Sequence, residues 1–285
     1  MKSARKGSAL IQEVHRTEVP FGTLAIWFLG QESVIIKGDG ITVYIDPYVS
    51  DFLDRNGPVR SYPAPIVPED ITQADLCLIT HEHDDHMDEG TLTVFHARNK
   101  KAPIIAPACC RQELLRMGVD GASILTADAG EARELFSKLR LTIIPAAHEE
   151  LEQDENGFER SVGYVLELNG VTLYHAGDTV IYPGLAERLA AIAPDVAMLP
   201  INGRDYFRRE KGIIGNMNYR EAAELAVRIG AETVIPLHYD VFAGNSEKPG
   251  YFVDYLYEHY PEQKCHVMAR GERFVYVSAC AFTKA

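Results

Sequence analysis

Residues 80–88, THEHDDHMD, gather three histidines and three aspartates directly behind the apolar run ADLCLI. In an extended segment, side chains two positions apart point the same way, so His81 and His83 can face one point. Asp85 and His86 begin the next turn and can face a second point nearby. Imidazole and carboxylate ligands suit divalent ions such as Zn, Mn or Fe. A solvated charged loop is the alternative, but this density of ligand types at a strand end favours a metal site.

A metal site needs further ligands, and three other apolar runs end in an ionisable residue. His148 ends LTIIPAA, Asp178 closes YHAGD, and His238 ends ETVIPL. Each alone is more typical of an ordinary loop residue. Because α/β folds present ligands where strands end, their recurrence beside the 80–88 cluster predicts one shared site.

The elements that position these residues are predicted from apolar periodicity and turn signals. Strands at 23–30, 33–38 and 41–47 read as an antiparallel meander, and 74–80 as a strand buried on both faces. A helix is expected from Asn218, where Asn218 and Glu221 have capping-box spacing, to Gly230. Further helices are expected at about 88–98 and 109–118, and further strands at 103–106, 140–146, 161–168, 171–175, 195–200, 232–238, 265–269 and 273–279.

The two halves of the chain repeat a pattern, since ADLCLITHEH and PDVAMLPINGRD are both apolar strands that end in a polar loop. No low-complexity linker separates them. The sequence therefore predicts an α/β fold with a single domain over residues 1–285, a four-layer αββα sandwich of two mixed β-sheets with outer helices.

Composition narrows the partners. The net charge of −13 opposes binding to nucleic acid or to an anionic membrane. No stretch approaches the roughly 18 apolar residues of a membrane span, and the first 20 residues lack the apolar region of a signal peptide. The five cysteines include no CxxC pair, which favours reduced, packed thiols. We expect a soluble, cytoplasmic protein, and a homo-oligomer remains compatible with the sequence.

The pattern His81-x-His83-x-Asp85-His86, followed by His148, Asp178 and His238, resembles the HxHxDH signature and distal ligands of the metallo-β-lactamase-fold hydrolases. The resemblance covers nearly the whole chain. Within this superfamily the sequence is most similar to the L-ascorbate-6-phosphate lactonase group. The shared segments are WFLG, IDP, THEHDDHMD, LYHAGDT, the stretch from NGRD to GNMN, and VIPLHYD.

The resemblance implies two divalent metal ions, Zn or Mn, with Fe also compatible. It assigns His81, His83 and His148 to one ion and Asp85, His86 and His238 to the other, with Asp178 bridging the two. Two ions about 3.5–4 Å apart would hold a bridging water and lower its pKa from 15.7 towards about 7. The resulting hydroxide would attack a lactone carbonyl polarised by a metal. Asp85 and Asp178 are thus the predicted catalytic residues, with Asp85 also accepting a proton.

Substrate choice is expected to depend on the loop INGRDYFRREKGIIGN, residues 201–216. Arg204 follows a strand closely and can contact an anionic substrate group, because guanidinium suits phosphate. Asn202, Tyr206, Tyr239 and Asn245 are further candidate substrate contacts on position alone. Outside the ligand set, His175 is expected to support a ligand, and Asp46 to tie loop backbone together rather than bind metal.

The leading hypothesis is a metal-dependent hydrolase that opens a sugar-derived lactone, with or without a phosphate group, so the predicted partner is a small molecule that is anionic if phosphorylated. A phosphodiesterase or ribonuclease of the same superfamily is the nearest alternative, which the acidic charge argues against. A flavodiiron-type protein is disfavoured, because such proteins carry Glu where this chain has His83 and because no flavin-binding domain is evident. A non-enzymatic metal-binding descendant is disfavoured by seven intact candidate ligands.

Overall fold

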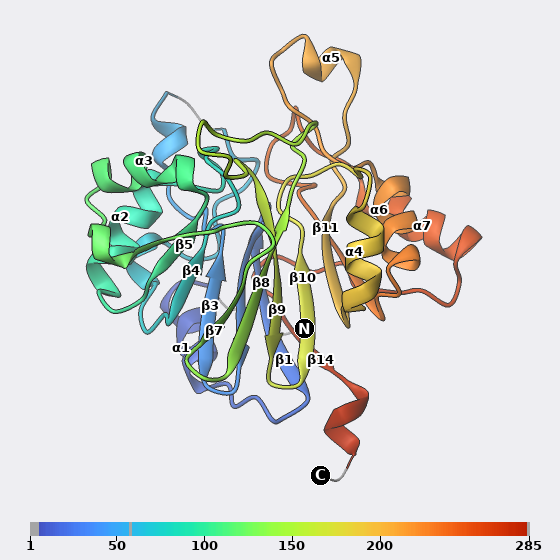
Figure 1. Ribbon diagram of the computed structural model, residues 1–285, viewed down its shortest axis with the longest axis horizontal. Helices are drawn as coiled ribbons and strands as arrows, with labels where there is room; N and C mark the ends of the chain where they lie inside the picture. Colours follow the sequence, from blue (N-terminus) through green and yellow to red (C-terminus); the bar gives the residue numbers. More distant parts are fainter. Residues whose placement is uncertain (1–5, 57–58, 284–285) are drawn as a thin grey trace.

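The fold is built from two mixed β-sheets packed face to face, as seen in a computed structural model (Figure 1). It describes residues 6–56 and 59–283, so both ends of the predicted domain 1–285 lie outside the described residues. In the described chain, the first sheet has the order β14 (Arg273–Val277), β1 (Thr23–Gly30), β2 (Ser33–Gly38), β3 (Ile41–Ile45), β4 (Leu76–Leu78), β5 (Ile104–Ala106) and β6 (Ile124–Thr126). The second has the order β13 (Lys264–Cys265), β12 (Thr233–Leu237), β11 (Val196–Pro200), β10 (Val171–His175), β9 (Val162–Leu168), β8 (Leu139–Pro145) and β7 (Ala132–Leu135).

The two sheets repeat one plan, as the sequence predicted. Each begins as an antiparallel meander, β1 to β3 in the first sheet and β7 to β10 in the second. Each continues with parallel strands, β3 to β6 and β10 to β13. Because every parallel crossover returns the chain to the same side, strand ends from both sheets meet at one edge of the sandwich.

Apolar residues on both faces explain why the central strands are continuous apolar runs. In β1, Leu24, Ile26 and Phe28 belong to the core between the sheets. The alternate residues Trp27 and Leu29 pack on the outer face. A strand with period-two side chains can be buried on both sides only if helices cover the outer face.

Helices provide that cover (Figure 1). The first sheet carries α1 (Ser8–Arg16), α2 (Glu89–Arg98) and α3 (Arg111–Arg116), and the second carries α4 (Leu185–Ile192), α6 (Tyr219–Arg228) and α7 (Pro249–His259). The predicted capping box at the start of α6 is present, with Asn218 and Glu221 bonded reciprocally. Short α5 (Tyr206–Arg209) stands apart on a projecting loop. In the described part of the chain, no helix is long and apolar enough to cross a membrane.

Several elements differ from the expectation. β4 is shorter than the predicted 74–80 because the Thr80 backbone N–H donates to the Asp46 carboxylate, at 2.8 Å, rather than to a strand. The predicted strand 265–269 is reduced to Lys264–Cys265. The helices α1, α4, α5 and α7 and the strands β6 and β7 were not predicted. All five cysteines are free thiols, as expected.

Candidate metal centre

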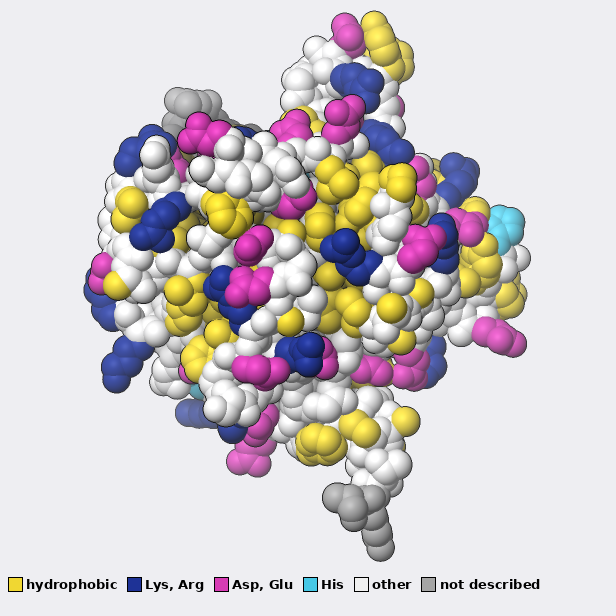
Figure 2. Space-filling view, viewed as in Figure 1, with side chains coloured by type: hydrophobic (Ala, Val, Ile, Leu, Met, Phe, Trp, Pro, Cys, Tyr) yellow, Lys and Arg dark blue, Asp and Glu magenta, His cyan; other side chains and the backbone are white. Residues whose placement is uncertain are grey.

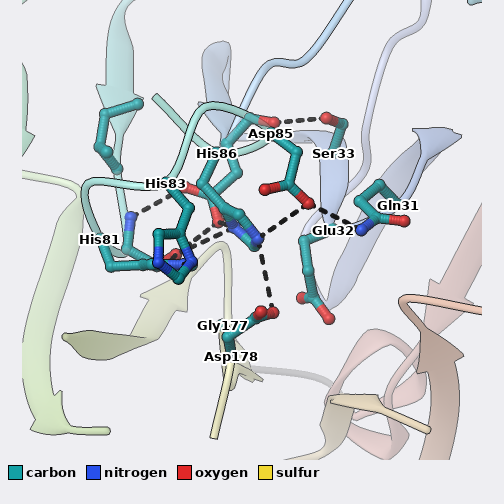
Figure 3. Close-up of polar contacts among 12 residues, drawn as sticks. Gln31, Glu32, Ser33, His81, His83, Asp85, His86, Gly177 and Asp178 are labelled. Carbon is teal, nitrogen blue, oxygen red and sulfur yellow. Dashed lines mark hydrogen bonds and ion pairs between the residues drawn. The ribbon is translucent and has the colours of Figure 1, made fainter. Parts of the chain in front are cut away.

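The seven predicted ligands lie in one cluster at the carboxyl edge of the two sheets. His81, His83, Asp85 and His86 follow β4 of the first sheet. His148, Asp178 and His238 follow β8, β10 and β12 of the second. Figure 3 shows the residues of the 81–86 segment facing Asp178 across this edge. The site is therefore shared between the sheets.

Three imidazole nitrogens form the first donor group. Nδ1 of His83 lies 2.9 Å from Nε2 of His81 and 3.2 Å from Nε2 of His148. Burial lowers the pKa of His81 well below its usual range, and lowers the pKa of His148 to about 4. Both rings are consequently neutral at pH 7, the form that can donate a lone pair to a metal.

Asp85, His86 and His238 form the second group. Oδ2 of Asp85 lies 3.6 Å from Nε2 of His86 and 3.9 Å from Nε2 of His238. Burial alone would lower the pKa of His86, but the carboxylates of Asp178, Asp85 and Asp46 outweigh it and hold the pKa well above its usual value. The carboxylates around this ring thus favour a positive charge at this place, which a metal ion would supply on displacing the proton of Nε2.

Asp178 lies between the two groups. Its Oδ1 is 3.5 Å from Nε2 of His86, and its Oδ2 is 3.3 Å from Nε2 of His238 and 3.7 Å from Nε2 of His148. Burial would raise the pKa of Asp178, yet the neighbouring His238 and His86 hold it well below its usual value. A buried carboxylate anion therefore faces both sets of histidines.

These residues fit divalent cations. The candidate ligand atoms fall into three groups, each with all its atoms within 4.8 Å of one another: His81, His83 and His148; His81, His86 and Asp178; and Asp85, His86 and His238. Nε2 of His86 and Oδ1 of Asp178 are buried without a hydrogen-bond partner. Buried polar atoms are normally paired, so unpaired atoms converging with neutral imidazoles and anionic carboxylates indicate a metal site.

Asp46 fixes the orientation of His86. Its fully buried carboxylate accepts hydrogen bonds from the backbone N–H of Thr80 at 2.8 Å, the hydroxyl of Thr80 at 2.6 Å, and Nδ1 of His86 at 2.8 Å. A proton held on Nδ1 leaves the lone pair of Nε2 facing the cluster. Asp46 therefore ties loop backbone, as predicted from its position, and also supports a ligand.

Gly177 lets Asp178 reach the cluster. This glycine has φ of 59°, and a Cβ there would lie 2.8 Å from Cβ of Thr80 and 3.0 Å from the Val162 carbonyl oxygen. Only glycine allows this close passage of the two sheets without strain. The HAGD turn thus explains how a residue after β10 meets residues after β4.

Gln31 and Glu32, in the turn after β1, were not predicted as site residues. Nε2 of Gln31 donates to Oδ2 of Asp85 at 2.8 Å and lies 2.9 Å from Nε2 of His238. The Glu32 carboxyl is fully buried with no hydrogen bond, and burial followed by the charge of Asp178 raises its pKa well above the usual range. Figure 3 shows both side chains beside the ligands.

Backbone conformation marks the same region. Gln31, Asp46 and His238 have φ of 59°, 44° and 54°, a left-handed conformation that non-glycine residues adopt at a cost. Such residues cluster where surrounding structure holds functional groups in place. In the sequence, the only available signal for Gln31 and Glu32 was their place in a tight turn.

Two cavities open beside the ligands. One, of about 360 Å³, has His83, Asp85, His148, Asp178 and His238 among its lining residues and is walled by Ile213, Ile214 and Phe242. The other, of about 480 Å³, lies on the side of His81, His83 and His148 and includes Glu82, Glu152 and Arg160. The two share His83, His148 and Ile214, so the candidate metal centre lies between an apolar and a polar space.

Of the residues predicted to contact substrate, Asn245 lines the apolar cavity, whereas the other four belong to neither lining. The Arg204 guanidinium makes two hydrogen bonds to the Glu221 carboxylate, at 2.7 and 2.8 Å, and one to the Asn216 carbonyl oxygen at 2.9 Å. It is thereby occupied in holding the loop to α6. Tyr206 is 67% exposed on α5, at the tip of the projecting loop whose hydrophobic side chains are visible in Figure 2.

Asn202 and Tyr239 are buried in structural contacts. Asn202 donates to Oδ1 of Asn245 at 3.0 Å. Tyr239 stacks on Phe28, and its hydroxyl donates to the Met268 carbonyl oxygen at 3.1 Å. The lining of the two cavities includes none of Asn202, Arg204, Tyr206 or Tyr239.

His175 lies behind the ligands. Its Nε2 is 2.9 Å from the Glu32 carbonyl oxygen and 3.4 Å from Oε2 of the Glu32 carboxyl. The ring is fully buried, and burial lowers its pKa. His175 therefore joins β10 to the β1–β2 turn, and it belongs to none of the three candidate ligand groups.

The chain is similar to known proteins in sequence and in fold. A sequence profile of the Beta-lactamase superfamily domain matches residues 42–239, which include all seven candidate ligands. The chain belongs to this superfamily. A UPF0173 metal-dependent hydrolase of Archaeoglobus fulgidus is 31% identical over 225 residues, covering 77% of this chain and 84% of that protein. The present chain is accordingly a metal-dependent hydrolase of this superfamily.

Two further comparisons extend the likeness. A probable L-ascorbate-6-phosphate lactonase of Escherichia fergusonii is 25% identical over 277 residues, covering 85% of this chain and 77% of that protein. Igni18, a metallo hydrolase from Ignicoccus hospitalis, superposes with a TM-score of 0.69 at 24% identity, covering 89% of this chain and 98% of that one. At that identity the structural match establishes the αββα fold, which confirms the fold class predicted from the sequence.

Proposed function

We propose that this hydrolase opens the ester bond of a lactone, using two divalent ions, Zn or Mn with Fe also compatible, held by the seven clustered residues. His81, His83 and His148 would hold one ion, and Asp85, His86 and His238 the other. The observation that carries the proposal is the placement of Asp178, with carboxylate oxygens 3.3–3.7 Å from ligands of both groups. When bound, such ions supply a water of lowered pKa and polarise a carbonyl oxygen.

The chain's own residues would prepare the reaction around that centre. Asp46 keeps the proton of His86 on Nδ1, so that Nε2 faces inward. Asp85, with 18% of its side chain exposed, lines the apolar cavity and offers a carboxylate oxygen to a proton released during attack. The cavity wall of Ile213, Ile214 and Phe242 would limit access of bulk water.

Two observations favour a lactone over a phosphodiester. The relative from Escherichia fergusonii is named as a probable lactonase, and its match covers 85% of this chain. The net charge of −13 opposes the approach of a polyanionic nucleic acid. A phosphodiesterase of the same superfamily is the second candidate. We propose instead an enzyme of the cytoplasm that acts on a small molecule, in agreement with both observations.

A panel of lactones, phosphodiesters and β-lactams, assayed with Mn, with Zn and with chelator, tests the proposal. We expect metal-dependent lactone hydrolysis that chelator abolishes. Diesterase activity with no lactonase activity under any metal would reject it.

The bridging position of Asp178 has its own test. Asp178→Ala should lower both metal content and rate. Asp84→Ala, in the same motif but exposed and outside all three ligand groups, is the matched control and should change neither. Full occupancy by two ions in Asp178→Ala would contradict the bridging role.

A further inference from the structure

The cavity beside the second ligand group has an apolar wall. Ile213, Ile214 and Phe242 supply this wall, opposite the carboxylates and imidazoles of the candidate metal centre. Ile214 is 41% exposed, although large aliphatic side chains facing water gain nothing there. The volume of the cavity, about 360 Å³, lies near the lower end of the roughly 300–1,000 Å³ typical of small-molecule sites.

Apart from the ions proposed for the metal centre, this cavity has no cationic partner for a ligand among its described side chains. Within the described residues, no lysine or arginine is part of the cavity lining. The nearby arginines are bound to other groups: Arg204 to Glu221, Arg209 to Glu149, and Arg160 to Glu82 and Glu152. Lys211 lies two residues before Ile213 and is not part of the cavity lining.

Arg208 is also used to build the wall rather than to bind a ligand. Its guanidinium donates to the carbonyl oxygens of Asn202 and Ser246 and pairs with Asp205 at 3.0 Å. These contacts join the loop that carries Ile213 and Ile214 to the loop that carries Phe242. Arg208 thus joins the two loops that supply the apolar wall.

We propose that this wall binds an uncharged alkyl arm of the substrate, so that the substrate class is a neutral, alkyl-substituted lactone and not a phosphorylated sugar lactone. The inference rests on the proposed lactonase function. With the lactone carbonyl at the metal ions, a phosphate group on the remote arm would lie against Ile213, Ile214 and Phe242, where it would lose water without gaining a guanidinium partner. An alkyl group would cover Ile214 and gain the free energy of apolar burial.

Kinetics of the Mn- or Zn-loaded protein on γ-lactones with side chains from methyl to hexyl test the inference. We expect kcat/KM to rise about threefold with each added methylene until the wall is filled. A phosphorylated sugar lactone should be a poorer substrate than the best alkyl lactone. Ile214→Ala should flatten the dependence on chain length, whereas Leu115→Ala, which removes a similarly exposed aliphatic side chain on α3, should leave it unchanged.

Two further measurements support the test. A variant that inserts a charge gives a gain in selectivity that misfolding cannot produce, and a binding measurement does not depend on turnover. Ile214→Arg should shift the ratio of kcat/KM towards the phosphorylated lactone by about tenfold, because it supplies the missing cation. Calorimetric binding of matched alkyl-substituted γ-lactams should strengthen with chain length in the wild type and not in Ile214→Ala.

The outcomes separate the two proposals. No hydrolysis of any lactone would reject the proposed function, while lactam binding would still decide whether the wall takes alkyl groups. Lactone hydrolysis with a flat chain-length series, or with the phosphorylated lactone preferred, would overturn the inference and leave the lactonase proposal standing.

Discussion

The substitution Asp46→Asn tests whether a residue outside the ligand set controls metal binding. The carboxylate accepts three hydrogen bonds in a fully buried position, one of them from Nδ1 of His86. An asparagine can still accept the Thr80 N–H through its oxygen. Its NH₂ group would then face His86 and donate to Nδ1, which moves the ring proton to Nε2. The nitrogen that faces the cluster would lose its lone pair.

The magnitude follows from the bonds that change. A hydrogen bond to a charged group contributes about 1.5–3 kcal/mol. Loss of a residue that orients a metal ligand typically costs about 10–100-fold in metal affinity. We therefore expect Asp46→Asn to weaken binding of one ion by one to two orders of magnitude, about 1.4–2.8 kcal/mol, while the other ion is held nearly as in the wild type.

Competition with a chromophoric chelator, which resolves two binding steps, measures this change. Asp75→Asn is the control, because Asp75 accepts a backbone N–H, that of Thr42, at 2.8 Å and belongs to none of the ligand groups. It should retain both affinities. Two wild-type affinities in Asp46→Asn, with nitrogen NMR showing His86 still protonated on Nδ1, would refute the reasoning.

Three further predictions concern groups around the site. In metal-free protein, His148 stays neutral down to a pKa of about 4 against an ordinary 6.5, so its contribution is complete above pH 6.5 and is lost as the pH falls towards 4. The loss is about 3 kcal/mol, and urea unfolding should show a shallower acid decline in His148→Gln; equal declines would contradict this. Glu32 has a raised pKa, so the wild type loses stability as pH rises above about 4.5. Glu32→Gln should therefore gain stability over the wild type progressively between pH 5 and 8, and a gain independent of pH would exclude this explanation. Arg204→Ala should destabilise the fold by about 1 kcal/mol without changing the preference between phosphorylated and neutral lactones, and Arg204→Ala/Glu221→Ala should be no less stable than the single variants. A selective rise in KM for the phosphorylated lactone would instead restore Arg204 as a substrate contact.

The ligand cluster was predictable because strand ends are visible in the sequence. Apolar runs followed by His148, Asp178 and His238 indicated the edge of a sheet, and parallel topology brings such edges together. The fold class followed from the same runs, since strands with apolar residues on both faces require covering helices.

The contacts of the residues predicted to bind substrate were not predictable, because long side chains are placed by their partners. Arg204 follows a strand at the site, yet Glu221 on α6 captures its guanidinium. Tyr239 is adjacent to His238, but the left-handed backbone of His238 turns the chain there, and Tyr239 packs into the core on Phe28. Glu32 had no sequence signal beyond its place in a turn, because its burial depends on contacts with β10 made through His175.

The division of the ligands between the sheets has a consequence for folding. Four candidate ligands follow a strand of the first sheet and three follow strands of the second. An ion bound there would therefore link the two sheets. Neither sheet alone supplies a complete set of ligands, so the full affinity for metal is reached only once the two sheets have docked. A ligand that binds only the native state shifts the folding equilibrium towards that state. Metal affinity would therefore depend on how stably the two sheets dock, even where the contacts between them lie far from the metal site. A cavity made in the shared core, for example by Leu166→Ala, should then release metal more readily although it touches no ligand.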